Sequence, residues 1–265
     1  GIRLGGRLHT AGVQAPLIVL FHGNGEIAAD YDDLGPLYNR LGISLLVIDY
    51  RGYGASDGQP TAGNLLADAV AVFQRLDDLL AGHGLAPAGL YAMGRSLGSA
   101  AAVEAASHAG ERLAGIIVES GFADTFALLA RLGLHVRSAG EAADGFDNAG
   151  KLAHISTPLL IIHGGNDILI PPADGQELYR RSAAADKRLV LISGAGHNDL
   201  LWAGREAYFD AIAAFVAGHR PARGPAGNPQ LQSDRGGRFR LDDDPHLAVP
   251  RGARLLLQPQ LARLL

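Results

Sequence analysis

A serine stands between two glycines in the stretch Gly94-Arg95-Ser96-Leu97-Gly98. An apolar run precedes this stretch and an alanine-rich run follows it, which predicts a strand that turns sharply into a helix. Glycines on both sides of the serine leave room for such a turn, and the turn holds the serine hydroxyl above the edge of a sheet. The stretch therefore makes Ser96 a candidate nucleophile.

A serine nucleophile needs a general base, and the base needs a carboxylate that orients it. Asp167 follows an apolar run in IIHGGNDILIP, and His197 follows the next one in LISGAGHNDLLW. Taken singly, Asp167 could form only a turn and His197 could only cap the helix after it. All three residues in this order, each just beyond a predicted strand, favour a catalytic triad of Ser96, Asp167 and His197.

Acyl transfer also needs backbone amides that stabilise the developing oxyanion. The N–H of Leu97 lies at the start of the helix after Ser96, where the helix dipole favours negative charge. A second donor is expected in the loop of LFHGNGE, which follows an early strand. We predict that the N–H groups of Asn24 and Leu97 form an oxyanion hole.

Other ionisable residues near strand ends are weaker candidates. His22 and His163 are competing bases, but both occur in His-Gly pairs, where structural hydrogen bonding is the expected role. A three-histidine metal site lacks the spacing of a metalloprotease helix, so we expect no metal and no cofactor. Asp124 and Asp199 are alternative carboxylates, and Glu119 is expected to be structural.

The elements that would position these residues alternate in type along the chain. Buried strands are predicted at Pro16–Gly23, Ile43–Asp49, Gly89–Gly94, Ala114–Val118, Pro158–His163 and Arg188–Ile192. Helices are predicted at Asp32–Leu41, Asn64–Leu80, Leu97–His108, Pro172–Ala184 and Trp202–Ala217. This alternation predicts an α/β fold with a mostly parallel sheet, helices on both faces, and chemistry at the carboxyl ends of the strands.

Two segments interrupt this pattern within a predicted main domain at residues 1–218. Residues 125–157 contain helical fragments but no strand, which predicts a short cap insertion. Residues 219–265 carry eight arginines, four aspartates and six scattered prolines, which predicts a poorly ordered tail. Only residues 2–9 precede the first buried strand.

The composition and net charge of the chain limit the kinds of partner that it is expected to bind. The 265 residues carry a net charge of −4, and 23 of the 27 acidic residues lie before position 219. An acidic body argues against a nucleic-acid partner. The apolar runs are far shorter than the roughly 20 residues that cross a bilayer, so no stable membrane insertion is expected. The absence of cysteine excludes disulfides and thiolate metal sites, and a cytoplasmic protein is expected. Only two of 23 basic residues are lysines, a bias typical of GC-rich bacterial genomes.

Five motifs together carry a resemblance to a known family. FHGNGE, VIDYRGYGASDGQPT, GRSLGS, LLIIHGGNDILIP and GAGHND resemble the α/β-hydrolase superfamily across residues 16–218. They are similar to its small-capped serine hydrolases, which include protein depalmitoylases and bacterial esterases. The resemblance implies the α/β-hydrolase fold, an acyl-Ser96 intermediate and an ester or thioester substrate. It also implies that Arg51 is structural and that Tyr53 borders the substrate site. Compared with this family, the short segment before the first buried strand implies that the usual N-terminal antiparallel strands are truncated.

Two alternative functions stay open at this point. The superfamily includes prolyl-aminopeptidase-like serine peptidases, although residues 125–157 show no acidic cluster dedicated to a substrate amine. A non-catalytic binding module on the same fold is the other, and an intact triad weighs against it. Dehalogenase and epoxide hydrolase chemistry is disfavoured because those enzymes use an aspartate nucleophile, whereas this position holds Ser96. The oligomeric state and the physiological substrate are not predicted.

Overall fold

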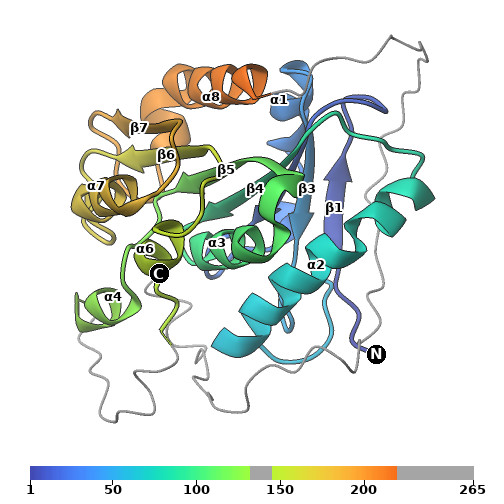
Figure 1. Ribbon diagram of the computed structural model, residues 1–265, viewed down its shortest axis with the longest axis horizontal. Helices are drawn as coiled ribbons and strands as arrows, with labels where there is room; N and C mark the ends of the chain where they lie inside the picture. The colour runs from blue at the N-terminus through green and yellow to red at the C-terminus, as the bar shows by residue number, and fades with distance from the viewer. Residues whose placement is uncertain (132–144, 220–265) are drawn as a thin grey trace.

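The computed structural model describes residues 1–131 and 145–219, which contain a twisted seven-stranded sheet (Figure 1). Its strands are β1 (Gly6–His9), β2 (Leu17–Phe21), β3 (Ser44–Ile48), β4 (Leu90–Arg95), β5 (Leu113–Glu119), β6 (Leu159–Gly164) and β7 (Lys187–Ile192). The strand order is β1-β3-β2-β4-β5-β6-β7. Strand β1 is antiparallel to β3, and the other pairs are parallel. The predicted α/β fold is confirmed.

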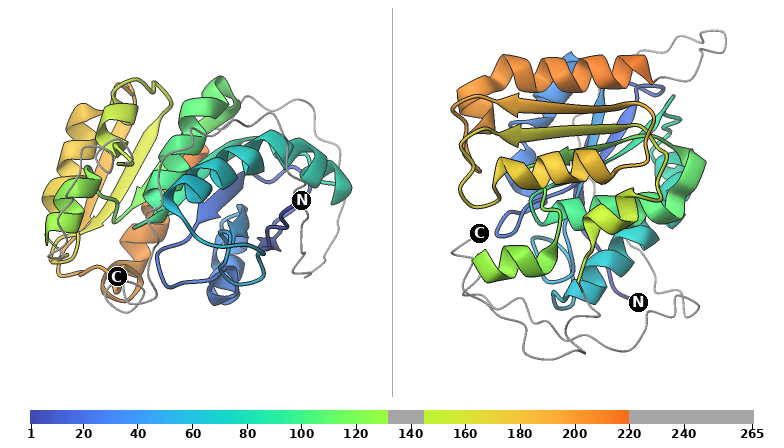
Figure 2. Two further views of the ribbon diagram at one scale, coloured as in Figure 1. Left: turned by 90° about the horizontal axis from the view of Figure 1, so that it is seen from below. Right: turned by 60° about the vertical axis from the view of Figure 1, so that its left-hand side comes forward.

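Helices cover both faces of this sheet (Figure 2). They are α1 (Gly35–Arg40), α2 (Ala62–Gly82), α3 (Gly98–Ala109), α4 (Thr125–Arg131), α6 (Asn148–Leu152), α7 (Pro172–Arg181) and α8 (Leu200–Gly218). Helices α2, α3, α6 and α7 contribute to the apolar core on one face, and α1 and α8 contribute to the core on the other. Every residue of β2, β3 and β6 is buried, as expected for continuous apolar runs inside a parallel sheet.

Two helices on the first face, α2 and α3, flank strand β4 in the chain, and Ser96 lies between β4 and α3. Helix α2 begins after Thr61, whose hydroxyl accepts a hydrogen bond from the N–H of Asn64 at 3.1 Å, a typical N-cap. Helix α3 follows β4 directly and buries the small side chains of residues 100–102 completely. Because alanine leaves the backbone close to its neighbours, α3 packs tightly beneath the sheet and against α2 (Figure 1).

Three expectations from the sequence differ from the structure or lie outside it. The helix predicted from Asp32 begins only at Gly35, with Pro36 in its first turn and a 3-10 turn at Ala28–Tyr31 before it. Proline fits the first turn because its missing N–H would have no partner there. The cap predicted at residues 125–157 is described only as α4 and residues 145–157, and residues 132–144 lie outside the described residues. Of the predicted tail, only His219 is described.

Two further observations concern the segment before β2 and the lengths of the helices. The short segment before β2 forms β1, a single antiparallel strand at the edge of the sheet beside β3. Within residues 1–131 and 145–219, no helix combines the length and the apolar character needed to cross a membrane.

Candidate active site

Ser96 lies at the turn between β4 and α3 in a left-handed backbone conformation, with φ of 51°. L-residues rarely adopt this region because the Cβ crowds the following carbonyl. A Cβ at Gly94 would collide with the carbonyl oxygen of Gly98, and a Cβ at Gly98 would collide with the carbonyl oxygen of Phe21. Glycine is therefore required at both positions. At Gly98 the reason is the close approach of strand β2, which the sequence did not indicate.

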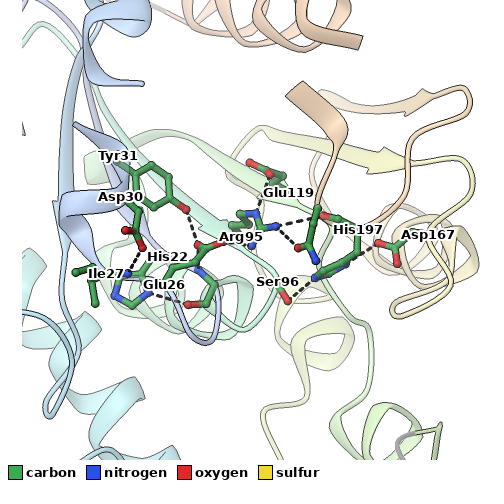
Figure 3. A network of polar contacts seen from close by, with 12 residues as sticks. His22, Glu26, Ile27, Asp30, Tyr31, Arg95, Ser96, Glu119, Asp167 and His197 are labelled. Atoms are coloured by element: carbon green, nitrogen blue, oxygen red, sulfur yellow. Dashed lines mark hydrogen bonds and ion pairs between the residues drawn. The ribbon is translucent and has the colours of Figure 1, made fainter. Parts of the chain in front are cut away.

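The structure brings the three predicted triad residues together at the carboxyl edge of the sheet (Figure 3). His197 Nε2 lies 2.9 Å from Ser96 Oγ, and His197 Nδ1 lies 2.7 Å from Asp167 Oδ2. The three residues retain only 4%, 7% and 2% of their accessible surface, in the order Ser96, His197, Asp167. A base within hydrogen-bond reach of a hydroxyl, itself oriented by a carboxylate, can deprotonate that hydroxyl as it attacks.

Asp167 is held as a carboxylate by its surroundings. Its Oδ1 accepts hydrogen bonds from the N–H groups of Leu169 at 3.0 Å and Ile170 at 2.8 Å. Burial by itself would raise the pKa of Asp167, but the contacts from His163 and His197 and the Ile170 N–H outweigh it and hold the pKa well below its usual range. The negative charge needed to orient and stabilise an imidazolium is thus fixed in place.

Asn24 belongs to the loop after β2, which passes close to the turn that carries Ser96, since a Cβ at Gly98 would meet the carbonyl oxygen of His22 and a Cβ at Gly23 would meet the guanidinium of Arg95. Asn24 is buried, and its Oδ1 accepts a hydrogen bond of 2.7 Å from the hydroxyl of Tyr53. Leu97 is the N-cap residue of α3, immediately after Ser96. Tyr53, expected at the edge of the substrate site, is half-buried and anchors the loop that carries the Asn24 amide.

The competing histidines are engaged in their own loops. His22 Nδ1 lies 2.8 Å from the carbonyl oxygen of Gly23, and the His22 ring is completely buried. His163 Nε2 lies 2.8 Å from the carbonyl oxygen of Ile170, in the loop that carries Asp167. Neither ring is placed against Ser96, and the expected structural roles agree with these contacts.

The alternative carboxylates also bond to neighbouring backbone. Asp124 Oδ1 accepts a hydrogen bond of 2.7 Å from the N–H of Ala127 at the start of α4. Asp199 Oδ1 accepts from the N–H of Gly196 and so shapes the loop that carries His197. Both therefore support local turns, whereas Asp167 alone among the three candidate aspartates contacts His197.

One residue of the site was not identified from the sequence. The guanidinium of Arg95 contacts Glu26 in the loop after β2, Glu119 at the end of β5, and Asn198 beside His197 (Figure 3). Burial raises the pKa of Glu119, although Arg95 and a hydrogen bond from Tyr208 oppose this shift. An arginine inside a Gly-x-Ser-x-Gly stretch was the only sequence signal for this network.

The chain is similar to known hydrolases in sequence and fold. A family model described as serine aminopeptidase, S33 matches residues 13–132 and 126–201. An uncharacterised protein of Mycobacterium tuberculosis is 32% identical in an alignment of 225 residues that covers 82% of this chain and 75% of that protein. Human alpha/beta hydrolase domain-containing protein 17B is 31% identical in an alignment of 204 residues that covers 76% of this chain and 66% of that protein. An esterase structure from Pyrococcus furiosus aligns with a TM-score of 0.67 and 18% identity over 83% of this chain and 89% of that one, which shows the shared fold.

Proposed function

The chain belongs to the α/β-hydrolase superfamily, in the family described as serine aminopeptidase, S33, and on this basis we propose that it cleaves carboxylic esters or thioesters through an acyl-serine intermediate. The observation that carries the proposal is the hydrogen-bonded chain from Ser96 through His197 to Asp167, with Ser96 in a strained left-handed turn. Strained residues of this kind cluster at active sites, where the strain fixes a reactive geometry.

In the acylation half of the proposed reaction, Ser96 Oγ attacks the substrate carbonyl carbon and passes its proton to His197 Nε2. The carbonyl oxygen becomes an oxyanion, which the N–H groups of Asn24 and Leu97 stabilise. The bond to the leaving oxygen or sulfur then breaks, and Nε2 returns its proton to that atom. The alcohol or thiol departs and the acyl group stays on Ser96. Asp167 stabilises the imidazolium that exists between the two proton transfers.

In the deacylation half, water attacks the acyl carbon and gives one proton to His197 Nε2. The bond between the acyl carbon and Ser96 Oγ breaks, and Oγ takes the proton from Nε2. The carboxylic acid leaves and the free hydroxyl of Ser96 is restored. The proposed reaction uses only these residues and water, and His197 gives back each proton that it accepts.

An ester or thioester substrate is favoured over a peptide with a free amino terminus. An aminopeptidase needs a carboxylate free to bind the substrate amine. The two carboxylates beside Arg95 are already engaged, since Glu26 contacts Arg95, the N–H of Gly23 and the hydroxyl of Tyr31, and Glu119 contacts Arg95 and Tyr208. Among the residues that the structure describes near Ser96, these two glutamates therefore hold the neighbouring loops and strands in place, and their carboxylates are not available to bind a substrate amine.

The family description nevertheless makes an aminopeptidase the second candidate. The deciding experiment compares p-nitrophenyl esters of increasing acyl length with aminoacyl-p-nitroanilides, including proline p-nitroanilide, on the wild type and on Ser96→Ala. We expect ester hydrolysis that Ser96→Ala abolishes and slow cleavage of the anilides. Faster cleavage of proline p-nitroanilide than of any ester would replace this proposal with the peptidase. Ester turnover by the wild type no faster than by Ser96→Ala would favour a binding module.

A further inference from the structure

Arg95 lies between two loops of the candidate site, the loop after β2 and the loop that carries His197. On one side, its guanidinium contacts Glu26, and Glu26 Oε2 accepts a hydrogen bond of 2.7 Å from the N–H of Gly23, the residue before Asn24. The hydroxyl of Tyr31 donates to the same oxygen at 2.8 Å. The loop that would supply one oxyanion donor is therefore fixed through Glu26 to Arg95.

On the other side, Arg95 reaches the loop of the candidate base. Its Nη2 donates to the carbonyl oxygen of His197 at 3.2 Å and to Asn198 Oδ1 at 2.7 Å. Figure 3 shows the guanidinium between Glu26 and the His197 loop, with Ser96 next to it. One side chain thus joins the oxyanion side and the base side of the nucleophile.

A third anchor fixes the guanidinium relative to the sheet. Arg95 Nε lies 3.2 Å from Glu119 Oε1 at the end of β5, and the other oxygen of Glu119 accepts a hydrogen bond of 2.7 Å from Tyr208 of α8. The side chain of Arg95 is 13% exposed. Buried charge-assisted bonds of this kind are short and directional. The planar guanidinium of arginine holds five donors in fixed directions, whereas the three donors of a lysine ammonium lie on one compact, rotatable group.

We propose that Arg95 is a positioning residue that sets the spacing between the oxyanion loop and the His197 loop around Ser96. This inference rests on the proposed function, because it assigns Arg95 a role in the geometry of that reaction. Arg95 itself touches neither the substrate nor the reacting atoms in this scheme. Misplacing catalytic groups by about 1 Å can lower a rate about 100-fold. Removing the Arg95 guanidinium is therefore expected to lower kcat.

The test compares Arg95→Gln and Arg95→Lys with Arg112→Gln as the matched control. Arg112 precedes β5, at the end of the strand opposite to Glu119, and also makes several bonds, to both carboxylate oxygens of Asp77 at 2.9 and 2.8 Å and to the carbonyl of Phe73 at 3.0 Å. All variants are assayed with p-nitrophenyl butyrate well below their thermal midpoints. A trifluoromethyl ketone, which forms an oxyanion with a nucleophilic serine, measures binding of the tetrahedral state.

We expect Arg95→Gln to lower kcat about 100-fold with little change in KM. The Ki of the trifluoromethyl ketone should rise in parallel with the fall in kcat/KM, since both report transition-state binding. Arg95→Lys should recover only a small part of kcat, because an ammonium keeps the charge but cannot span the three anchors. Arg112→Gln should keep wild-type kcat and Ki even where it lowers the thermal midpoint.

Wild-type kcat in Arg95→Gln, or full recovery in Arg95→Lys, would overturn the inference. If Arg95→Gln does not fold, Glu26→Gln and Asn198→Ala replace it in the test, because each weakens one side of the network. Both variants should have a lower kcat. An unchanged kcat in both would also overturn the inference that Arg95 positions the two loops. The proposed function is judged separately by Ser96→Ala. An inactive Ser96→Ala beside a fully active Arg95→Gln refutes only the positioning role, whereas an active Ser96→Ala refutes the proposed function.

Discussion

Replacing Ser96 by glycine should give a more stable protein than replacing it by alanine, although both changes remove the nucleophile. Both variants lose the same hydrogen bond to His197, so that loss cancels in the comparison. What differs is the backbone, which is left-handed at Ser96 with φ of 51°. Alanine keeps the Cβ that clashes in this conformation, and glycine removes it.

The size of the difference follows from two opposing effects. The left-handed conformation costs an L-residue about 1–2 kcal/mol. Glycine loses more backbone entropy on folding, which offsets about 0.5–1 kcal/mol of this gain. The glycine variant should therefore have a free energy of unfolding above that of the alanine variant by about 0.75 kcal/mol, the midpoint of a range of about 0–1.5 kcal/mol. For a domain of this size, 1 kcal/mol corresponds to about 2–4 °C in the thermal midpoint.

Ser107 provides the control with the opposite sign. It is exposed within α3, where alanine is favoured over glycine by about 1 kcal/mol. Thermal and urea unfolding of the four variants should rank glycine above alanine at position 96 and alanine above glycine at position 107. If alanine is at least as stable as glycine at position 96, Ser96 stores no backbone strain and this explanation of the turn is wrong.

Three further changes probe the surroundings of Ser96 and the buried hydroxyls. Asp167→Asn should lower kcat about 10⁴-fold without unfolding the protein, because the amide cannot fix the imidazole tautomer or stabilise its charge; steady-state kinetics and circular dichroism check this. Tyr53→Phe, which removes the 2.7 Å bond to Asn24, should lower kcat about 2–10-fold, the value of one neutral hydrogen bond of about 0.5–1.5 kcal/mol; a larger change in KM than in kcat would instead assign Tyr53 to substrate binding. Burial is the main cause that raises the pKa of five of the seven tyrosines, namely Tyr31, Tyr38, Tyr50, Tyr53 and Tyr208. Tyrosines of the unfolded chain ionise near pH 10, whereas these five stay protonated in the folded protein. The native state therefore binds more protons than the unfolded state above that pH, and the free energy of unfolding should fall as the pH rises. An absorbance titration should show most phenolates appearing only with unfolding.

The three residues of the candidate triad could be predicted because each follows an apolar run that forms a strand. Parallel strands bring their carboxyl ends to one edge, so Ser96, Asp167 and His197 had to lie near one another once the fold was assigned. Their chain order then matched a known arrangement. The direct contacts among them agree with that placement.

The Arg95 network could not be predicted in the same way. Its partners Glu26 and Asn198 are 69 and 103 residues away in sequence, and their meeting depends on which strands are neighbours and on side-chain rotamers. The clash at Gly98 depends likewise on β2 lying beside β4. The start of α1 at Gly35 depends on the loop before it, which forms a 3-10 turn although the residues from Asp32 have helical spacing.

Covalent labelling by a fluorophosphonate probe tests the central claim most directly, because such probes react with an activated serine whatever the natural substrate is. Intact-mass spectrometry of the treated wild type should show one adduct, and peptide mapping should place it on Ser96. Ser96→Ala should show no adduct, and Asp167→Asn should label much more slowly. An unlabelled wild type, or labelling of Ser96→Ala at the wild-type rate, would contradict the assignment of Ser96 as the nucleophile.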